Sequence, residues 1–392
     1  MMLKLHHAFS VAVMLVLLPL TVTAQLFETR ATAAYVIDQT TGTVLLSKNA
    51  TTPLPPASMS KLMTIYMAFE AIADGRLKIE EKLLVSQHAM NYGGSTMFLR
   101  AGERVTVEDL LRGVIVLSGN DASTVLAEAL SFDGSEAGFA RIMTERAREM
   151  GMINSIFANA NGWPAANHRM SMKDLGILAN RLIADFPNFY ALFSEQEFAF
   201  DGRAPANSQN RNPILSLGIG ADGLKTGHTS EAGYGLVGSA KQGERRIIFV
   251  ITGMESAIAR AEEAENIVSW GFRQFAQKDI IRAGTKLVDA AVWMGDQPSV
   301  GLTVANDLSL LVPVLGTANG ISAKIVYEGP FTAPIAQGQK LGELIVTLDG
   351  LPEAQIPLIA DRNVAKGGFS ERIRTAAMVL WQRFAPPSQD AV

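Results

Sequence analysis

The strand-like segments of this chain lie at the two ends of residues 25–282, and a helical block separates them. Alternating apolar residues around Gly42 predict a hairpin over residues 34–46, and Gly-rich, β-branched stretches predict strands over residues 224–240 and 246–254. Because unpaired strands leave backbone groups without partners, the early and late strands are expected to meet in one sheet with the helices packed on it. This order predicts an α/β (α+β) fold with an antiparallel sheet.

Within the block, apolar residues recur at the spacing of helices. The helices expected are residues 58–73, 106–117, 121–130, 135–150 and 171–182, and a further helix is expected at residues 259–275. Residues 154–169 are rich in Asn, Ala and Gly and predict a loop.

From about residue 283 the pattern changes to short apolar runs separated by Gly, Pro, Asn and Asp. This predicts a small all-β sandwich domain over residues 283–367, after a larger domain over residues 25–282. After Gly367-Gly368, apolar residues at helical spacing predict an amphipathic helix over residues 368–392 that is too short to span a membrane. It can pack on its own domain or lie on a membrane surface, and its aromatic and arginine residues favour the membrane.

Residues 1–24 have the parts of a secretory signal peptide. Lys4 gives a positive start, residues 8–20 are apolar, and residues 22–24 are the small residues of a cleavage site. Cleavage after Ala24 is predicted, and an uncleaved anchor is the alternative. The chain has no cysteine, so an exported form must be stabilised by its core without disulfides.

The charge balance and the histidine content exclude several functions. The formal net charge is −4 with 18% charged residues, so there is no basic excess to indicate a nucleic-acid partner. Five histidines without ligand spacing, and no cysteine, predict no metal site, and no cofactor is predicted. The glycines at 218, 220 and 223 match a dinucleotide-binding fingerprint, but no helix is expected after them, which favours a loop.

Three short motifs follow one another along the chain, and the first is Ser58-Met59-Ser60-Lys61. It starts a predicted helix, where residues i and i+3 face the same side, so the hydroxyl and the amine can meet. A serine hydroxyl becomes a good nucleophile when a base takes its proton, and lysine is such a base only if its pKa is lowered. The structural alternative is a helix cap followed by a surface lysine.

The second motif, Ser118-Gly119-Asn120, lies between two predicted helices. Ser118 could pass a proton between the base and a leaving group, and Asn120 could bond both Lys61 and a substrate carbonyl. The structural alternative is a helix C-cap followed by an N-cap.

The third motif, Lys225-Thr226-Gly227, lies on a predicted strand. Its lysine can bind a carboxylate and oppose protonation of Lys61, and Gly227 leaves room for a substrate backbone. A peptide could then pair with this segment as an added strand. The structural alternative is a turn with a surface lysine.

With these motifs in this order, the chain resembles the penicillin-binding protein and serine β-lactamase superfamily. It resembles most closely the low-molecular-mass D-alanyl-D-alanine carboxypeptidases of bacterial envelopes. Residues 56–61, 117–122 and 222–234 carry the resemblance, which extends over nearly the whole mature chain. It implies a transpeptidase-like domain, a trailing β-sandwich domain and an amphipathic tail.

The resemblance also implies a role for each motif residue. Ser58 would be the acylated nucleophile, Lys61 its base and Ser118 a further catalytic group. The substrate-binding residues implied are Asn120, Lys225, Thr226, Gly227 and His228. The main-chain N–H groups of Ser58 and His228 would form the oxyanion hole.

The sequence therefore predicts a serine D-alanyl-D-alanine carboxypeptidase that removes the terminal D-Ala from peptidoglycan pentapeptide stems and is inhibited by β-lactams. It is expected in the periplasm, attached to the outer face of the cytoplasmic membrane through its C-terminal helix. The alternatives are a serine β-lactamase and a non-catalytic penicillin-binding sensor or scaffold. Gly119 stands where class A β-lactamases have Asp, and no Glu can be assigned as their deacylating base, so the carboxypeptidase is favoured.

Overall fold

The computed structural model describes residues 27–203, 206–314, 321–348, 351, 353–369 and 373. The predicted signal peptide lies outside the described residues. So does the predicted amphipathic helix, apart from Gly368, Phe369 and Ile373.

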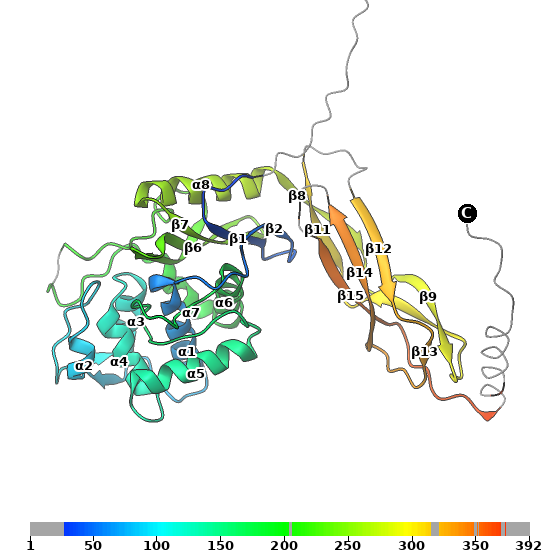
Figure 1. The fold of residues 1–392 in the computed structure, drawn as a ribbon, viewed down its shortest axis with the longest axis horizontal. Helices are drawn as coiled ribbons and strands as arrows, with labels where there is room; N and C mark the ends of the chain where they lie inside the picture. Colours follow the sequence, from blue (N-terminus) through cyan, green and yellow to red (C-terminus); the bar gives the residue numbers. More distant parts are fainter. Residues whose placement is uncertain are drawn as a thin grey trace, which may run out of the picture.

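The first domain is built on an antiparallel sheet that joins the two ends of its chain (Figure 1). Its strand order is β2-β1-β7-β6-β5, with bounds β1 Ala33–Asp38, β2 Val44–Lys48, β5 Ala221–Thr229, β6 Gly233–Gln242 and β7 Arg245–Met254. Tyr35 of β1 lies opposite Val250 of β7, so the predicted pairing of early and late strands is confirmed. Strand β5, which carries the third motif, is at the edge of this sheet.

Helices cover both faces of the sheet. The central strand β7 is apolar on both faces, and each face packs against its own core. Ile248 and Val250 pack toward one core, and Phe249 and Ile251 pack toward the other. The second core is closed by α8 (Ala257–Arg273), which Figure 1 shows on the opposite side of the sheet from the other helices. The sheet is therefore covered on both faces, and β5 forms one of its two edges.

The larger core holds the helical block that the sequence predicts. Its helices are α1 Lys61–Ala73, α2 Gln87–Met90, α3 Val107–Ile115, α4 Asn120–Leu130, α5 Glu136–Glu149, α6 Met172–Asp185 and α7 Pro187–Tyr190. The strand pair β3 (Lys82–Leu84) and β4 (Arg104–Thr106) and the 3-10 helix η2 (Ala191–Ser194) complete it. The helix expected to begin at Ser58 instead begins at Lys61, because residues Ala57–Ser60 form a 3-10 turn, η1.

The later strands form an all-β domain, as predicted, which extends away from the first domain in Figure 1. Its larger sheet has the order β12-β14-β15-β10-β9-β13, with bounds β9 Lys286–Trp293, β10 Ser299–Val304, β12 Ile321–Tyr327, β13 Phe331–Thr332, β14 Lys340–Leu348 and β15 Ala354–Ala360. A pair, β8 (Phe275–Ile281) and β11 (Leu308–Pro313), packs against the same apolar core.

The helix expected at residues 259–275 ends at Arg273 because Phe275 begins β8. The division of the chain at residue 282 stays a prediction. Within the described part of the chain, no helix is both long and apolar enough to cross a membrane.

Candidate active site

Ser58 and Lys61 meet at the junction of η1 and α1. Ser58 is half-buried, and Lys61, the first residue of α1, is fully buried. The distance from Lys61 Nζ to Ser58 Oγ is 2.9 Å. The serine and the lysine of the first motif therefore form a hydrogen-bonded pair, which a cap with a surface lysine would not do.

Lys61 Nζ has two further partners, and both are oxygen acceptors. Asn120 Oδ1 lies 2.7 Å away, and the main-chain oxygen of Asn161 accepts a hydrogen bond from the same nitrogen. A neutral amine has two hydrogens and one lone pair, so it can donate to Asn120 and Asn161 and accept from the Ser58 hydroxyl. This set of partners matches a lysine that acts as a base toward Ser58.

The surroundings of Lys61 favour this neutral form. Burial, followed by the positive charge of Arg211, lowers the pKa of Lys61 to about 7, although the negative charges of Asp121 and Glu136 oppose the shift. A general base works best when its pKa is near the working pH. Lys61 meets this condition at neutral pH.

The second motif forms the turn between α3 and α4. Ser118 is 2% exposed and has a left-handed backbone, with a φ of 61°. Asn120 is the first residue of α4. Its main-chain N–H donates to Ser95 O at 2.7 Å, and its side-chain Nδ2 donates to Gly93 O at 2.8 Å. The side-chain oxygen of Asn120 is thereby directed at Lys61.

The third motif lies on β5, next to the nucleophile turn. Lys225 is 2% exposed and donates to Thr226 O at 3.3 Å. Burial, followed by the charges of Lys61, Arg211 and Arg260, holds the pKa of Lys225 well below its ordinary value. A surface lysine on a turn is therefore the wrong interpretation of this motif.

Gly227 lets the edge strand approach the nucleophile. A Cβ at this position would lie 3.0 Å from Met59 Cγ and from Pro56 O, so a larger residue would push β5 away from η1. The next residue, His228, stacks its ring on Tyr234 with the centroids 3.9 Å apart. The oxyanion hole expected from the main-chain N–H groups of Ser58 and His228 stays a prediction.

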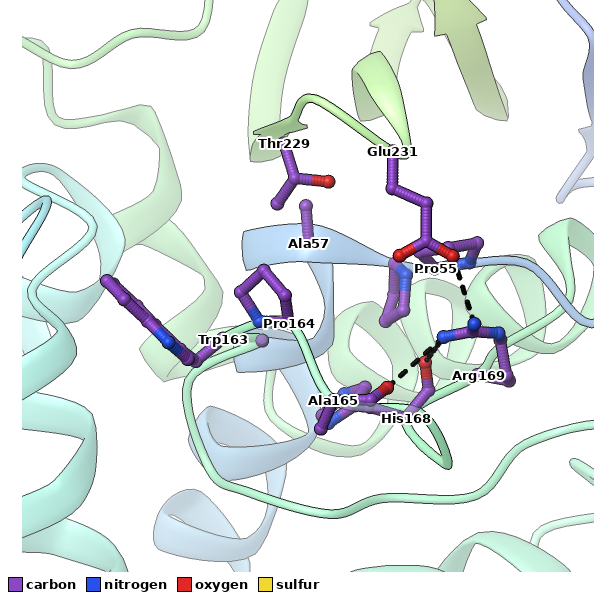
Figure 2. A pocket seen from close by; sticks show the side chains of 11 residues that line it. Pro55, Ala57, Trp163, Pro164, Ala165, His168, Arg169, Thr229 and Glu231 are labelled. Atoms are coloured by element: carbon purple, nitrogen blue, oxygen red, sulfur yellow. Dashed lines mark hydrogen bonds and ion pairs between the residues drawn. The ribbon is translucent and has the colours of Figure 1, made fainter.

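Two hollows lie beyond His228. One, shown in Figure 2, lies beside Ala57 and Trp163 and is bounded by an ion pair of 3.0 Å between Arg169 and Glu231. The other is a cleft of about 460 Å³, and its walls include His228 and the same Glu231. Both hollows include Thr229, the last residue of β5, in their walls.

Three participants were missed by the sequence reasoning: Arg211, Glu136 and the main-chain carbonyl of Asn161. Arg211 Nη1 donates to Ser95 Oγ at 2.5 Å and Nη2 to Asn207 Oδ1 at 3.0 Å. Arg211 and Glu136 belong to none of the three motifs, and a backbone carbonyl leaves no signature in a sequence. Among the described residues, no group of His, Cys, Asp and Glu could hold a metal ion.

Comparison with known proteins decides the family. The family profile described as D-alanyl-D-alanine carboxypeptidase matches residues 20–256. The chain belongs to the D-alanyl-D-alanine carboxypeptidase family. A second profile, the C-terminal domain of penicillin-binding protein 5, matches residues 275–366 of this carboxypeptidase-family chain.

Individual relatives agree with this assignment. The chain is 35% identical to D-alanyl-D-alanine carboxypeptidase DacC of Escherichia coli (strain K12) over 361 residues, or 90% of this chain and 89% of the relative. Its fold is similar to penicillin-binding protein 5 from Haemophilus influenzae, with a TM-score of 0.74 and 32% identity, over 87% of this chain and 100% of the other. Penicillin-binding protein D2 from Listeria monocytogenes, solved in its ampicillin bound form, is similar over 63% of this chain and 99% of its own, with a TM-score of 0.54 and 31% identity.

The family assignment confirms the predicted penicillin-binding protein fold with a C-terminal all-β domain and the predicted serine D-alanyl-D-alanine carboxypeptidase activity. It does not assign roles to individual residues.

Proposed function

We propose that Ser58 is the nucleophile of this carboxypeptidase and that Lys61 is its base. The supporting observation is the 2.9 Å contact between Lys61 Nζ and Ser58 Oγ around a fully buried amine. Lys61 takes the hydroxyl proton as Ser58 Oγ attacks the carbonyl carbon of the penultimate D-Ala. The C–N bond then breaks, the terminal D-Ala leaves with a proton on its nitrogen, and water hydrolyses the ester to regenerate Ser58.

The other motif residues complete the cycle. Ser118 passes the proton toward the leaving nitrogen, and Asn120 binds a substrate carbonyl through its amide. Lys225 and Thr226 bind the terminal carboxylate, since the buried Lys225 amine interacts with two further cationic side chains, Arg211 and Arg260. The N–H groups of Ser58 and His228 stabilise the oxyanion, a contribution of about 2.7–4 kcal/mol for one such donor.

The substrate extends along β5. A peptide with its carboxylate at Lys225 and its scissile carbonyl at Ser58 runs antiparallel to β5 and leaves past His228. Its preceding residues then enter the cleft of about 460 Å³ beyond His228. This arrangement suits a pentapeptide stem of peptidoglycan.

Mass spectrometry after incubation with benzylpenicillin tests the nucleophile. We expect a single adduct on the peptide that contains Ser58, together with release of D-alanine from a pentapeptide. An adduct on another residue, or none on the folded protein, contradicts the proposal. An adduct without D-alanine release indicates the non-catalytic sensor, and fast repeated penicillin hydrolysis indicates the β-lactamase.

Replacement of Arg211 should move the pH profile of acylation. The Arg211 charge lowers the pKa of Lys61, so Arg211→Met raises that pKa and less of the amine is neutral below it. The acidic limb, near pH 7 in the unchanged protein, should move to higher pH. The measurement is the second-order rate of benzylpenicillin acylation from about pH 5 to about pH 9. Arg181→Met, which removes a remote arginine of α6 paired with Asp185, is the control and should leave the limb in place.

We also propose that residues 1–24 direct export, that the first domain ends near residue 282, and that residues 368–392 bind the outer face of the cytoplasmic membrane. The support is the amphipathic spacing and the aromatic residues of the tail. Removing residues 368–392 should release the protein from the membrane fraction without loss of acylation. A truncated protein that stays membrane-bound contradicts the attachment.

A further inference from the structure

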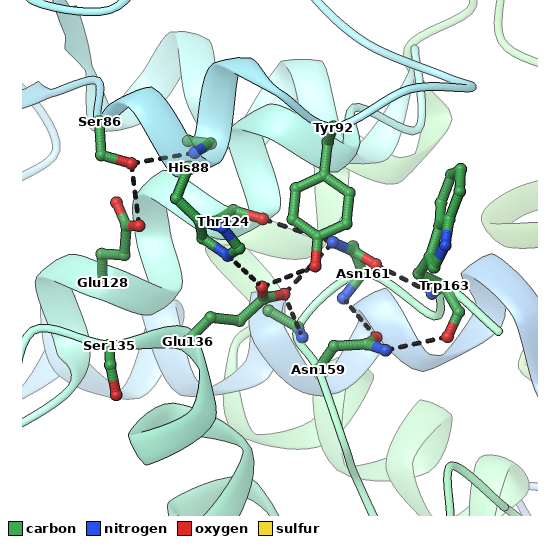
Figure 3. Close-up of polar contacts among 12 residues, drawn as sticks. Ser86, His88, Tyr92, Thr124, Glu128, Ser135, Glu136, Asn159, Asn161 and Trp163 are labelled. Atoms are coloured by element: carbon green, nitrogen blue, oxygen red, sulfur yellow. Dashed lines mark hydrogen bonds and ion pairs between the residues drawn. The ribbon is translucent and has the colours of Figure 1, made fainter. Parts of the chain in front are cut away.

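Glu136 is a buried carboxylate that belongs to none of the three motifs. It is the first residue of α5 and is 7% exposed. Its Oε1 accepts from Ala160 N at 2.9 Å and from Asn161 Nδ2 at 3.2 Å. Its Oε2 accepts from the Tyr92 hydroxyl at 2.7 Å and lies 2.9 Å from His88 Nε2 (Figure 3). One oxygen thus serves an internal loop, and the other serves two side chains of the α2 region.

The loop held by Glu136 is the loop that contacts the catalytic helix. Ala160 O accepts from Thr64 Oγ1 at 2.6 Å, and Asn161 O accepts from Lys61 Nζ. Two consecutive carbonyls therefore bind α1, while the N–H and the amide of the same two residues bind Glu136. A displacement of the Glu136 carboxylate would shift the carbonyl that Lys61 uses as a partner.

We propose that Glu136 is a positioning residue for Lys61, acting through the Ala160–Asn161 backbone. This inference rests on the proposed role of Lys61 as the base for Ser58. Tyr92 and His88 contact the Glu136 oxygen that faces away from the loop. The His88 side chain is 57% exposed, so a chain of contacts runs from the protein surface through His88, Glu136 and Asn161 to Lys61.

The charge of Glu136 also acts on Lys61. It raises the pKa of Lys61, together with Asp121, against the larger effect of burial and the effect of Arg211. The charged and titratable groups that interact with Lys61 are Asp121, Glu136, His168, Arg211 and Lys225. Those that interact with Glu136 are Lys61, His88, Tyr92 and Glu128.

Tyr92 stays a donor to this carboxylate. Burial and the hydrogen bond to Glu136 raise the pKa of the Tyr92 hydroxyl, so it remains protonated over the working range. The Glu136 carboxylate accordingly keeps its support on the α2 side while the pH is varied.

Two substitutions separate the position of the loop from the charge. Glu136→Gln keeps an oxygen that accepts from Ala160 N and Asn161 Nδ2 but removes the charge, so Lys61 should lose its proton at lower pH. The acidic limb of benzylpenicillin acylation should move down by about half a pH unit or more, with the plateau rate within about threefold. Glu136→Ala removes the support as well, and the plateau rate should fall about tenfold or more.

The control is Glu263→Gln, which neutralises another buried carboxylate, paired with Arg30 and absent from the groups that shift Lys61. Glu263→Gln should leave both the acidic limb and the plateau rate of benzylpenicillin acylation as they are in the original protein. If Glu136→Gln keeps the original limb and Glu136→Ala keeps the original plateau, Glu136 only stabilises the fold and the inference is wrong. If Glu136→Ala does not fold, Glu136→Asp takes its place: it keeps the charge but draws the carboxylate back from Ala160 N, so its plateau rate should fall, and an unchanged plateau overturns the inference. If the unchanged protein forms no Ser58 adduct, the proposed function fails first, and this inference fails with it.

Discussion

Replacing Lys61 by methionine should slow acylation of Ser58 by benzylpenicillin about 10²–10⁴-fold, the usual contribution of a general base. Methionine fills a similar volume, but it has no basic nitrogen to take the proton from Ser58 Oγ. The Lys61 amine lies 2.9 Å from that oxygen and is fully buried, so bulk solvent cannot replace it directly. The rate is measured by stopping the reaction with acid at set times and determining the acylated fraction by mass spectrometry.

Lys173→Met is the matched control, because Lys173 lies exposed on α6. It should acylate at the unchanged rate. Urea unfolding of Lys61→Met shows whether the protein is still folded at the assay conditions. A folded Lys61→Met protein that acylates within about tenfold of the original would exclude Lys61 as the principal base.

Gly162→Ala should reduce the free energy of unfolding by about 2–5 kcal/mol, from left-handed strain and overpacking together. Gly162 has a φ of +80°, which side chains rarely adopt, and a Cβ there would overlap the main-chain carbonyl of Ala57. Ala57 directly precedes Ser58. The substitution should therefore also slow acylation, about tenfold or more, by shifting the nucleophile turn.

Gly151→Ala separates strain from overlap. Gly151 has a similar φ of +83°, but an added Cβ would meet nothing within 4 Å. This control should cost about 1–2 kcal/mol and leave acylation unchanged. Equal losses in the two variants, measured by urea unfolding, would show that the contact with Ala57 is unimportant.

The local parts of the site were predictable from the sequence. Residues i and i+3 at a helix start face one side, and the structure confirms that Ser58 and Lys61 are in contact. The predicted pairing of residues 34–46 with the late strands is confirmed. It was predictable because the apolar alternation of these segments allows few other strand pairings that bury their apolar side chains. The loop at residues 154–169 is likewise confirmed in outline, since only isolated bridges occur there.

The long-range parts were not predictable. Asn161 contacts Lys61 through a backbone carbonyl, which any residue type could supply, and Glu136 reaches the same loop from the start of α5. Arg211 acts on Lys61 through charge alone. The turn before Lys61 was expected to be α-helical, but helical periodicity does not separate a 3-10 turn from the first turn of an α-helix.

The cationic group at β5 makes the stability of the protein responsive to anions. Lys225 and Arg260 are both less than 9% exposed, and Arg260 Nε has no hydrogen-bond partner in the described structure. Without a carboxylate beside them, burial disfavours the charged forms of these side chains, and a bound anion offsets that cost. Ligand binding and folding are therefore thermodynamically linked: an anion present at about 100 times its Kd adds about 2.7 kcal/mol of stability. The melting temperature of this protein becomes a direct readout of site occupancy, even for ligands that form no covalent bond.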